Sequence, residues 1–332
     1  MKDQPQKKSA VQVIIVAYNS GAFLQNCIEA LAIQTLRAFT VVIIDNASAD
    51  GSVEALDLPD DRFSVLDAGA NLGFAAGNNL AINISEADFV ALLNPDTVPA
   101  HDWLEALVDL ALADPSLGSV GSVQRRLDQP QVLDGLGDVW HVAGTAWRAQ
   151  EGALVLGDVL DGEIFGPCAA AALYRREAFL EVGGFDERYF CYMEDVDLAF
   201  RLRLAGYGSM RAGGSVVLHA GSGITGRHSD FSLYHGHRNR IWTFLKNTPH
   251  SVFWLALPYH LIFNLLYAAV ALGRGHAKPV FRAYRDAWCG RSPFLEARKS
   301  VARQMGWAEY FRLVAWTPWF SVGHQARPKE VN

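Results

Sequence analysis

Short apolar runs rich in Val and Ile alternate with stretches of helical periodicity over residues 11–93. Continuous apolar runs are typical of parallel strands that are buried on both faces. Strands are expected at 11–17, 39–44, 63–66 and 89–93. Helices are expected from 21 to about 33, briefly from 50, and from 71 to about 84. This alternation predicts an α/β fold with a doubly wound, mostly parallel sheet flanked by helices, and ligands at the carboxyl ends of the strands.

The pattern loosens over residues 120–166, where short strands and loops are expected. Beyond this region, strands are expected at 169–174 and 215–218, and helices at 176–181, 194–205 and 234–246. The helix at 194–205 is amphipathic, and Gly206 is suited to end it. The positions of this helix that we expect to face inward are Val196, Leu198, Ala199, Leu202 and Ala205.

Residues 251–272 are predominantly apolar, and no Asp, Glu, Lys or Arg occurs from 247 to 273. A segment of this length can span a bilayer. Pro258, His260 and Asn264 count against a simple span, because the last two give the helix a polar edge. Three alternatives stay open: an interfacial or re-entrant helix, a buried helix of a soluble protein, and a true span.

The formal net charge of −6 is unevenly distributed. Residues 1–250 carry 18 Lys and Arg against 31 Asp and Glu, whereas residues 251–332 carry 11 against 4. The last part also holds five of the nine tryptophans, which are Trp254, Trp288, Trp307, Trp316 and Trp319. Basic and aromatic residues suit the anionic cytoplasmic leaflet of a membrane, and an ordinary helical lid or dimer contact is the alternative. The acidic main body argues against a nucleic acid partner.

The four cysteines show no CxxC spacing, so neither a disulfide scaffold nor a zinc site is expected, and a reducing cytoplasm fits. Residues 1–10 are polar and lack an apolar core, which predicts a flexible tail and not a signal peptide. The expected organisation is a tail at 1–10, a catalytic domain at 11–247, and a helical, basic and aromatic region at 248–332 suited to membrane contact.

Acidic and amide side chains follow the expected strands, in places where a dinucleotide-binding fold would carry glycines. No GxGxxG follows the first strand, and no GxxxxGK[ST] occurs. Asp96 closes the fourth strand, where a carboxylate either holds a divalent cation against a substrate diphosphate or simply begins the next helix. Asp45 and Asn46 close the second strand, where they either hydrogen-bond a base or ribose or cap the next helix.

Three further groups are candidates for ligand contacts. His219 ends an expected strand and either completes a metal site with Asp96 or is a hydrogen-bonded core histidine. A glycine-rich stretch either lets the backbone approach a nucleotide or sugar or is only a helix start; it contains Asn71, Gly73, Gly77, Asn78 and Asn79. A cationic cluster either binds phosphates or is a solvated basic face; it consists of Arg227, His228, His235, His237 and Arg238.

The stretch 183–198 places five carboxylates among aromatic and apolar residues, just where a helix begins. Buried carboxylates are costly unless they are paired, metal-bound or used in chemistry. Partial desolvation can raise the pKa of Glu194 or Asp195 so that one of them acts as a general base. The alternative is that both are helix N-terminal acids favoured by the helix dipole. Asp197 is expected to pair with Arg201, one turn further along.

These motifs, taken in order, resemble those of the family 2 glycosyltransferases, whose fold is GT-A. The stretches that carry the resemblance are 16–20 (VAYNS), 45–52 (DNASADGS), 94–96 (NPD) and 194–195 (ED). Residues 71–79 and 184–207 are most similar to the rhamnosyltransferase-type branch of that family. The resemblance covers about residues 11–247, and the joint occurrence of the motifs is far more specific than any one of them.

The resemblance implies a role for each matching residue. Asp96 is the last acid of the family's metal-binding DxD motif, and Asn94 stands in place of the first. One carboxylate is then left for the metal, which makes His219 more necessary as a second ligand. Asp195 is the expected general base, and Glu194 would position it or touch the acceptor. The residues expected at the nucleotide are Ala17, Tyr18, Asn19 and Asp45.

The resemblance also implies an inverting transfer of a sugar, rhamnose being favoured, from a nucleoside-diphosphate sugar with Mg²⁺ or Mn²⁺. The acceptor would be a hydroxyl of a glycan or of a polyprenyl-diphosphate-linked glycan in bacterial cell-surface polysaccharide synthesis. The enzyme would work on the cytoplasmic face of the membrane. The alternatives are another hexosyl- or galactofuranosyltransferase of the same fold and a non-catalytic sugar-nucleotide-binding protein. A nucleotidyltransferase ranks last, because its glycine-rich loop with an arginine is missing after the first strand.

Overall fold

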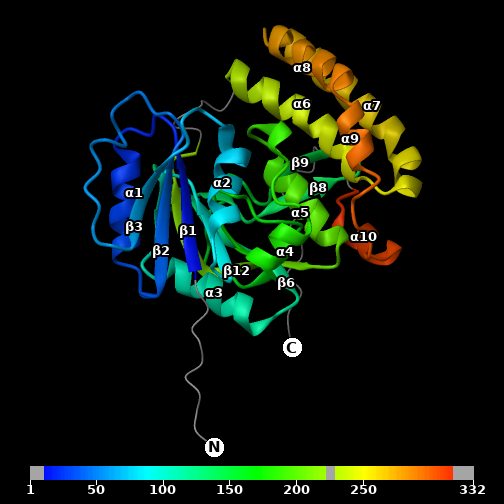
Figure 1. Cartoon of the computed structure of the whole chain (residues 1–332). Coiled ribbons are helices and arrows are strands. Elements are labelled where there is room, and N and C mark those ends of the chain that lie inside the picture. The colour runs from blue at the N-terminus through cyan, green and yellow to red at the C-terminus, as the bar shows by residue number, and fades with distance from the viewer. Residues whose placement is uncertain (1–10, 222–228, 317–332) are drawn as a thin grey trace, which may run out of the picture.

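One mixed sheet forms the centre of the computed structural model, which describes residues 11–221 and 229–316 (Figure 1). The strand order is β10-β12-β6-β11-β4-β1-β2-β3, with β5 paired to β12 and β7 paired to β6. Strands β3, β2, β1 and β4 are parallel, β11 is antiparallel to both β4 and β6, and β12 is parallel to β6. The strands are β1 (Val11–Ala17), β2 (Phe39–Asp45), β3 (Phe63–Asp67), β4 (Phe89–Leu93), β5 (Thr97–Pro99), β6 (Leu117–Arg126), β7 (Leu133–Gly135), β10 (Gly162–Glu163), β11 (Ala171–Arg175) and β12 (Gly208–His219). The α/β class with a mostly parallel sheet is therefore confirmed.

Helices cover both faces of this sheet. Successive residues of a strand point to opposite faces, so Ile15 of β1 enters one hydrophobic core and Ile14 enters the other. Both side chains are fully buried, which explains why residues 11–17 are almost entirely apolar. Helices α1 and α3 cover the first core, and α2, α4 and α5 cover the second. These helices are α1 (Phe23–Ala32), α2 (Gly73–Ile84), α3 (Trp103–Ala113), α4 (Arg176–Glu181) and α5 (Glu194–Leu204).

Two expectations about local structure are wrong. The short helix expected from residue 50 is only a turn, because the Asp50 carboxylate accepts hydrogen bonds from the backbone N–H groups of Ser52 and Gly21 and ties the segment to the neighbouring loop. Strand β12 is also much longer than the expected 215–218. Gly213 and Gly214 break the apolar pattern without ending the strand, and they coincide with a shift of its register against β6.

Helix α5 is buried on all sides. The five positions expected to face inward are buried, and Gly206 follows the helix with a φ of +94°. Phe200, Arg201 and Arg203 are buried as well, because α6 (Asp230–Asn247) covers the side of α5 that faces away from the sheet. The helix that begins with Glu194 and Asp195 is therefore held between the sheet and α6.

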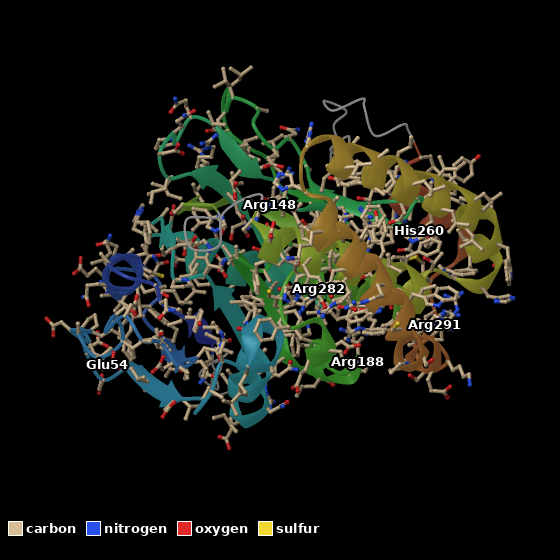
Figure 2. All side chains as sticks on the ribbon, turned by 90° about the horizontal axis from the view of Figure 1, so that it is seen from above. Glu54, Arg148, Arg188, His260, Arg282 and Arg291 are labelled. Carbon is tan, nitrogen blue, oxygen red and sulfur yellow. The ribbon has the colours of Figure 1, made fainter. Side chains whose placement is uncertain are left out.

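The C-terminal helices pack onto α6 and onto a small second sheet of β8 (Asp138–His141) and β9 (Thr145–Arg148). His260 of α7 stacks on Phe244 of α6 with ring centroids 4.0 Å apart. The backbone N–H of Ala315 donates to the carbonyl of Trp140 at 2.8 Å. The region 248–316 thus shares buried surfaces with the catalytic body. Its helices are α7 (His250–Gly273), α8 (Ala277–Cys289), α9 (Ser292–Ala297) and α10 (Trp307–Leu313). Seen from above, Glu54 lies at one side of the molecule and Arg291 at the other (Figure 2).

A buried ionic cluster fastens α5 to α6. Asp197, which is fully buried, accepts hydrogen bonds from Arg201 Nη2 at 2.7 Å and from Lys246 Nζ at 2.9 Å. Asn247 Nδ2 donates to its other oxygen at 2.8 Å. Burial alone would raise the pKa of Asp197, but the charges of Arg201 and Lys246 outweigh it and hold that pKa well below the ordinary value. The expected pairing of Asp197 with Arg201 is confirmed.

We expect Asp197→Asn to lower the free energy of unfolding by about 3–5 kcal/mol, because it leaves two buried cations without their shared carboxylate. A carboxyl with a lowered folded-state pKa stabilises the fold above its ordinary pKa and loses that effect as the pH falls. The difference from wild type, measured by urea unfolding, should therefore shrink on acidification. Glu296→Gln, which breaks an exposed ion pair with Lys299, is the matched control and should cost no more than about 1 kcal/mol. Equal losses from both substitutions would contradict this assignment.

Candidate active site

The carboxyl ends of β1 and β2 lie side by side, and their loops are locked together. Register pairs Ala17 with Asp45 at the ends of the two strands. Asn19 has a φ of +49°, and its side-chain oxygen accepts from the backbone N–H of Ala49 at 2.8 Å. Asp45 accepts from the backbone N–H of Ser48 at 2.9 Å. Three residues predicted to contact the nucleotide, Ala17, Asn19 and Asp45, are thus brought to one edge of the sheet, beside the 42% exposed Tyr18.

Asn46 ties this edge to the start of α2. Its side-chain oxygen accepts from the backbone N–H of Leu72 at 2.8 Å, and its Nδ2 donates to Asn71 Oδ1 at 3.0 Å. The side chain is 2% exposed, so these bonds are internal. Asn46 and Asn71 therefore shape the edge of the site through internal bonds. A contact of Asn46 with a base or ribose, and of Asn71 with the donor, stays a prediction.

The glycines of α2 are explained by packing within the protein. A Cβ on Gly73 would lie 2.5 Å from the Phe190 ring, and one on Gly77 would lie 3.0 Å from a methyl group of Val16. Asn78 is buried and donates to the carbonyl of Phe74 at 2.9 Å. These glycines do mark places where other atoms come close to the backbone, but those atoms belong to Phe190 and Val16 of this chain. A contact of Gly73, Gly77 or Asn78 with the donor stays a prediction.

Asp96 and His219 meet across the pairing of β5 with β12. His219 Nε2 lies 3.4 Å from Asp96 Oδ1, and both residues are buried. On the other side of the ring, His219 Nδ1 lies 2.8 Å from Asp134 Oδ2. Burial lowers the pKa of His219, but the hydrogen bonds to Asp134 and Asp96 outweigh it and raise that pKa above the ordinary value. Asp96 and His219 therefore lie together, and their role as metal ligands stays a prediction.

This arrangement suits a divalent cation held partly by substrate. A metal-bound histidine commonly donates its other ring N–H to a carboxylate, and Asp134 stands where that carboxylate would be. Asn94 lies at the end of β4, and its carbonyl accepts from Thr97 Oγ1 at 2.6 Å. Within residues 11–221 and 229–316, no group of three or more His, Cys, Asp or Glu could hold a metal ion. Oxygen atoms of a diphosphate and water would have to complete the coordination.

Asp195 lies at the start of α5, and its carboxylate is fixed by backbone donors. The N–H of Ala169 donates to Oδ2 at 3.2 Å, and the N–H of Val196 donates to Oδ1 at 2.8 Å. Burial raises the pKa of Asp195 above the ordinary value, although these two donors and the charge of Arg148 oppose the rise. Glu194 is 6% exposed, and burial together with the charge of Asp195 raises its pKa well above the ordinary value. Both carboxyls are therefore stronger bases than solvated ones.

Sequence analysis missed Asp134, Asp138 and Arg148, which come from the region read as loops and short strands. Arg148 forms an ion pair with Asp134, and its Cα pairs with that of Asp138 between β8 and β9. Asp138 is 7% exposed; burial and the charge of Asp195 raise its pKa well above the ordinary value. Asp134 and Arg148 thus continue the polar contacts of His219, and the charge of Arg148 opposes the rise in the pKa of Asp195. The available signal was the spacing of Asp134 and Asp138, four residues apart and followed by Arg148. Neighbouring residues do not reveal the strand pairing that brings these side chains together.

The expected cationic cluster is mostly not free to bind phosphate. Arg227 and His228 lie outside the described residues. His235 is buried against Phe190, and burial lowers its pKa to about 4, so it is neutral at physiological pH. Burial lowers the pKa of His237 to about 3. Arg238 donates to Asn239 Oδ1 at 2.9 Å and to the Tyr189 carbonyl at 3.1 Å. The prediction of a charged, open cluster is thus wrong for the two histidines, because Phe190 and Phe231 cover His235 while rings of α7 and α8 cover His237.

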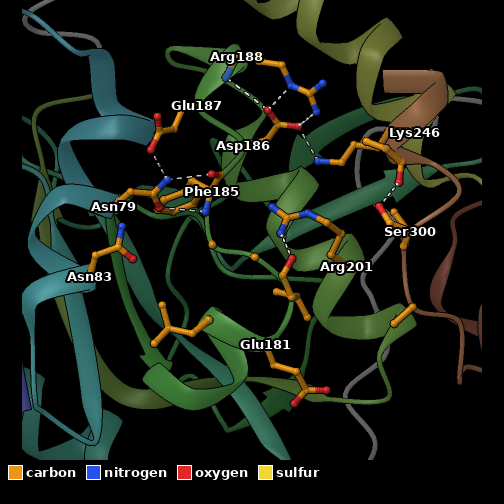
Figure 3. Close-up of a pocket in the computed structure, with 17 residues that line it drawn as sticks. Asn79, Asn83, Glu181, Phe185, Asp186, Glu187, Arg188, Arg201, Lys246 and Ser300 are labelled. Carbon is orange, nitrogen blue, oxygen red and sulfur yellow. Dashed lines mark hydrogen bonds and ion pairs between the residues drawn. The ribbon is translucent and has the colours of Figure 1, made fainter. Parts of the chain in front are cut away.

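A separate cavity of about 660 Å³ opens beside α2, α4 and residues 297–302 (Figure 3). Asn79, Asp186, Arg188 and Lys246 are among its lining residues, whereas Asp96 and Asp195 are not. Asp186 Oδ2 accepts from Lys246 Nζ at 2.8 Å and forms an ion pair with Arg188. Asp186, Arg188 and Lys246 are therefore paired with each other, and the cavity is distinct from the strand-end site.

Comparison with known proteins agrees with this arrangement. Residues 12–183 match glycosyl transferase family 2. An N-acetylglucosaminyl-diphospho-decaprenol L-rhamnosyltransferase of Mycobacterium tuberculosis is 33% identical over 271 residues, covering 74% of this chain and 86% of the relative. A mannosyltransferase of Pyrobaculum calidifontis in complex with GDP-Man and Mn²⁺ has a TM-score of 0.55 at 20% identity, covering 89% of this chain and 87% of that one. GalNAc-T7 with UDP, GalNAc and Mn²⁺ has a TM-score of 0.58 at 15% identity, covering 73% of this chain and 48% of that one.

The fold is therefore GT-A, the fold of nucleotide-sugar glycosyltransferases, with the candidate site at the carboxyl ends of its strands. The chain belongs to glycosyl transferase family 2. At identities of 20% and 15%, the two solved structures show a likeness of fold alone. The family and fold expected from the sequence motifs are confirmed.

We expect Asp138→Asn to raise the melting temperature at neutral pH, with a gain of about 0.5–2 kcal/mol. The physical reason is that the raised folded-state pKa of Asp138 marks a carboxylate whose charge the fold disfavours. Such a group stabilises the fold below its unfolded-state pKa of about 4 and loses that effect as the pH rises through the folded value. The gain should therefore disappear near pH 4 in thermal melts. Asp128→Asn, on an exposed ion pair with Arg126, is the control and should give no gain. Destabilisation by Asp138→Asn at neutral pH would show that pairing with Arg148 dominates.

Proposed function

We propose that this protein is an inverting glycosyltransferase that moves rhamnose from a nucleoside-diphosphate sugar to a hydroxyl of a polyprenyl-diphosphate-linked glycan. The observation that carries the proposal is the half-buried carboxylate of Asp195 at the start of α5, which two backbone N–H donors orient. It is supported by the Asp96–His219 pair, which Asp134 and Arg148 extend toward the charged groups that act on Asp195. The sugar and the acceptor are inferred from the name of the mycobacterial relative, which covers most of both chains.

Asp96 and His219 are the residues that would hold a divalent cation, with Asp134 orienting the histidine from its other ring nitrogen. Mg²⁺ or Mn²⁺ bound there would offset the negative charge that develops on the departing nucleoside diphosphate. A carboxylate oxygen and an imidazole nitrogen together suit Mn²⁺, and Mn²⁺ is present in both solved GT-A structures. The edge formed by Ala17, Tyr18 and Asp45 is where the nucleoside would lie.

Asp195 is the proposed general base. Its raised pKa makes it a better proton acceptor than a solvated carboxylate, provided that the pH lies above that pKa. It would take the proton of the acceptor hydroxyl while that oxygen attacks the sugar from the face opposite the leaving diphosphate. A single displacement of this kind inverts the configuration at the anomeric carbon. Glu194, whose pKa is raised further by burial, would donate a hydrogen bond to the acceptor when protonated.

Asp195→Asn tests this assignment. We expect turnover of deoxythymidine-diphosphate rhamnose with a polyprenyl-diphosphate N-acetylglucosamine acceptor to fall at least about 10²-fold, because the proton acceptor is lost while the shape is kept. Affinity for deoxythymidine diphosphate with Mn²⁺, measured by calorimetry, should change little. Unchanged turnover would sink the base assignment. A wild-type protein that binds sugar nucleotides but transfers none of them would favour the non-catalytic alternative.

We also propose that α7 and α8 rest on the cytoplasmic surface of the membrane. Among the described residues, α7 is the one helix long and apolar enough to cross a bilayer, and only 22% of its most apolar window is buried. One side of α7 is tied to the body: His260 Nδ1 lies 2.8 Å from the carbonyl of Ala143, and Asn264 Oδ1 accepts from Arg240 at 2.6 Å. A span would break these contacts, so they favour a helix that lies on the surface.

The opposite side of α7 and the neighbouring side of α8 carry the groups that suit an anionic interface. Exposed apolar residues of α7 include Trp254, Leu255, Tyr259, Leu261, Ile262, Leu265, Leu266 and Val270. Exposed basic residues at the end of α7 and on α8 are Arg274, Lys278, Arg282 and Arg285. Apolar contact supplies the affinity in such interfaces, and the cations select anionic lipid.

We expect the protein to sediment with vesicles containing anionic lipid at low salt, and Leu265→Asp with Leu266→Asp to reduce the bound fraction strongly. Leu156→Asp is the matched control, since Leu156 is 93% exposed but lies far along the chain from α7. It should leave vesicle binding unchanged. A protein that stays entirely in the supernatant with anionic vesicles at low salt would rule the membrane contact out.

A further inference from the structure

One side-chain amide, that of Asn239 on α6, gathers three backbone carbonyls of the loop that precedes the proposed base. Its Nδ2 lies 2.9 Å from the carbonyl oxygen of Tyr189 and 2.8 Å from those of Cys191 and Tyr192. The side chain is fully buried. An amide nitrogen carries two hydrogens, so the three carbonyls share them. Its orientation is fixed, because Oδ1 accepts from Arg238 Nε at 2.9 Å.

The loop held in this way has an unusual backbone. Phe190 has φ 67° and ψ −65°, and the N–H of Cys191 donates to the carbonyl of Tyr189 at 2.9 Å, which together define a rare and strained type of γ-turn. Tyr192 and Met193 also have positive φ values, of 66° and 71°. None of these residues is glycine, so the loop needs outside bonds to keep this shape. Asn239 provides bonds on both sides of the turn.

The same loop connects the two halves of the site. At its end, Met193 directly precedes Glu194 and Asp195, so the loop sets where α5 begins. At its start, the carbonyl of Phe190 accepts from the N–H of Ala75 at 3.1 Å, in the first turn of α2. The loop therefore connects two parts of the site. One is the start of α2, next to the proposed donor edge, and the other is the Asp195 carboxylate, the proposed base. Helix α6, which carries Asn239, contacts α5 along this side.

We propose that Asn239 is a positioning residue for the transfer reaction: its amide holds the 189–193 loop in the strained form that places the Asp195 carboxylate. This inference rests on the proposed role of Asp195 as the base. Asn239 acts through the backbone and does not itself touch the reacting atoms. Arg238 supports it twice, by orienting the amide and by donating to the Tyr189 carbonyl at 3.1 Å.

The test is Asn239→Ala in the full-length protein, compared with Gln34→Leu. Gln34 is an equally buried amide that bonds the carbonyl of Ala100 at 2.7 Å and the N–H of Leu104 at 3.0 Å, on the other side of the sheet. Both variants should melt at lower temperature. For Asn239→Ala alone, kcat per nucleotide-binding site counted by calorimetry should fall about 10²-fold, the size expected when a catalytic group is misplaced by about 1 Å. KM for the donor should stay within about threefold.

A double-mutant cycle with Asp195→Asn completes the test, using single-turnover reactions with excess enzyme. If Asn239 acts through Asp195, adding Asn239→Ala to the Asp195→Asn protein should lower the residual rate less than about threefold. Equal effects of Asn239→Ala and Gln34→Leu on kcat per site would show that Asn239 is only structural. Full additivity with Asp195→Asn would show that it acts on something else. Both outcomes overturn the inference and leave the proposed function intact, whereas unchanged turnover by Asp195→Asn alone would remove the base assignment beneath it.

Discussion

The buried carboxylate of Asp197 is the contact on which the arrangement of this molecule depends. It joins the first turn of α5 to the last turn of α6 through Arg201, Lys246 and Asn247. Without it, the buried Arg201 would lose its carboxylate partner, and Lys246 would keep only Asp186. With it, α6 is held along α5, and the side chains of α6 therefore have fixed positions relative to the start of α5. The C-terminal helices in turn pack on α6.

Three acids within one turn of α5 have different surroundings and so different chemistry. Asp197 is surrounded by donors and cations, which hold its pKa below the ordinary value. Burial raises the pKa values of Glu194 and Asp195, and the charge of Asp195 raises that of Glu194 as well. Separation of pKa values by environment is a common way in which one site obtains both structural and reactive carboxyls. The fold fixes Asp197 as an anion and keeps Asp195 basic.

Local patterns in the sequence predicted much of this fold, because buried strands and helix starts depend on residues that are neighbours in the sequence. The bounds of β1, β4 and α4 agree with the expected ranges, and the five positions of α5 expected to face inward are buried. The burial of the rest of α5 by α6 was not expected from the sequence. The motif at Asp96 and the strand end at His219 were enough to place that pair together. What failed depends on contacts distant in sequence: Asp134 and Asp138 reach the site through strand pairing, and the space beside Gly73 is filled by Phe190. A glycine in a sequence shows that a side chain is absent, but not which residue fills the space beside it.

The short sheet of β8 and β9 has one more neighbour, since Ala315 pairs with His141 and bonds to Trp140. Asp138 lies on the same strand, a few residues before His141. Residues more than a hundred positions after the acidic helix therefore form part of the wall that supports the carboxylates. Both ends of the described chain thus contribute to this region: β1 ends at Ala17, on the edge proposed for the nucleoside, and Ala315 pairs with the strand that carries Asp138. The wall behind these carboxylates is therefore complete only when the C-terminal segment that ends at Ala315 is docked on β8.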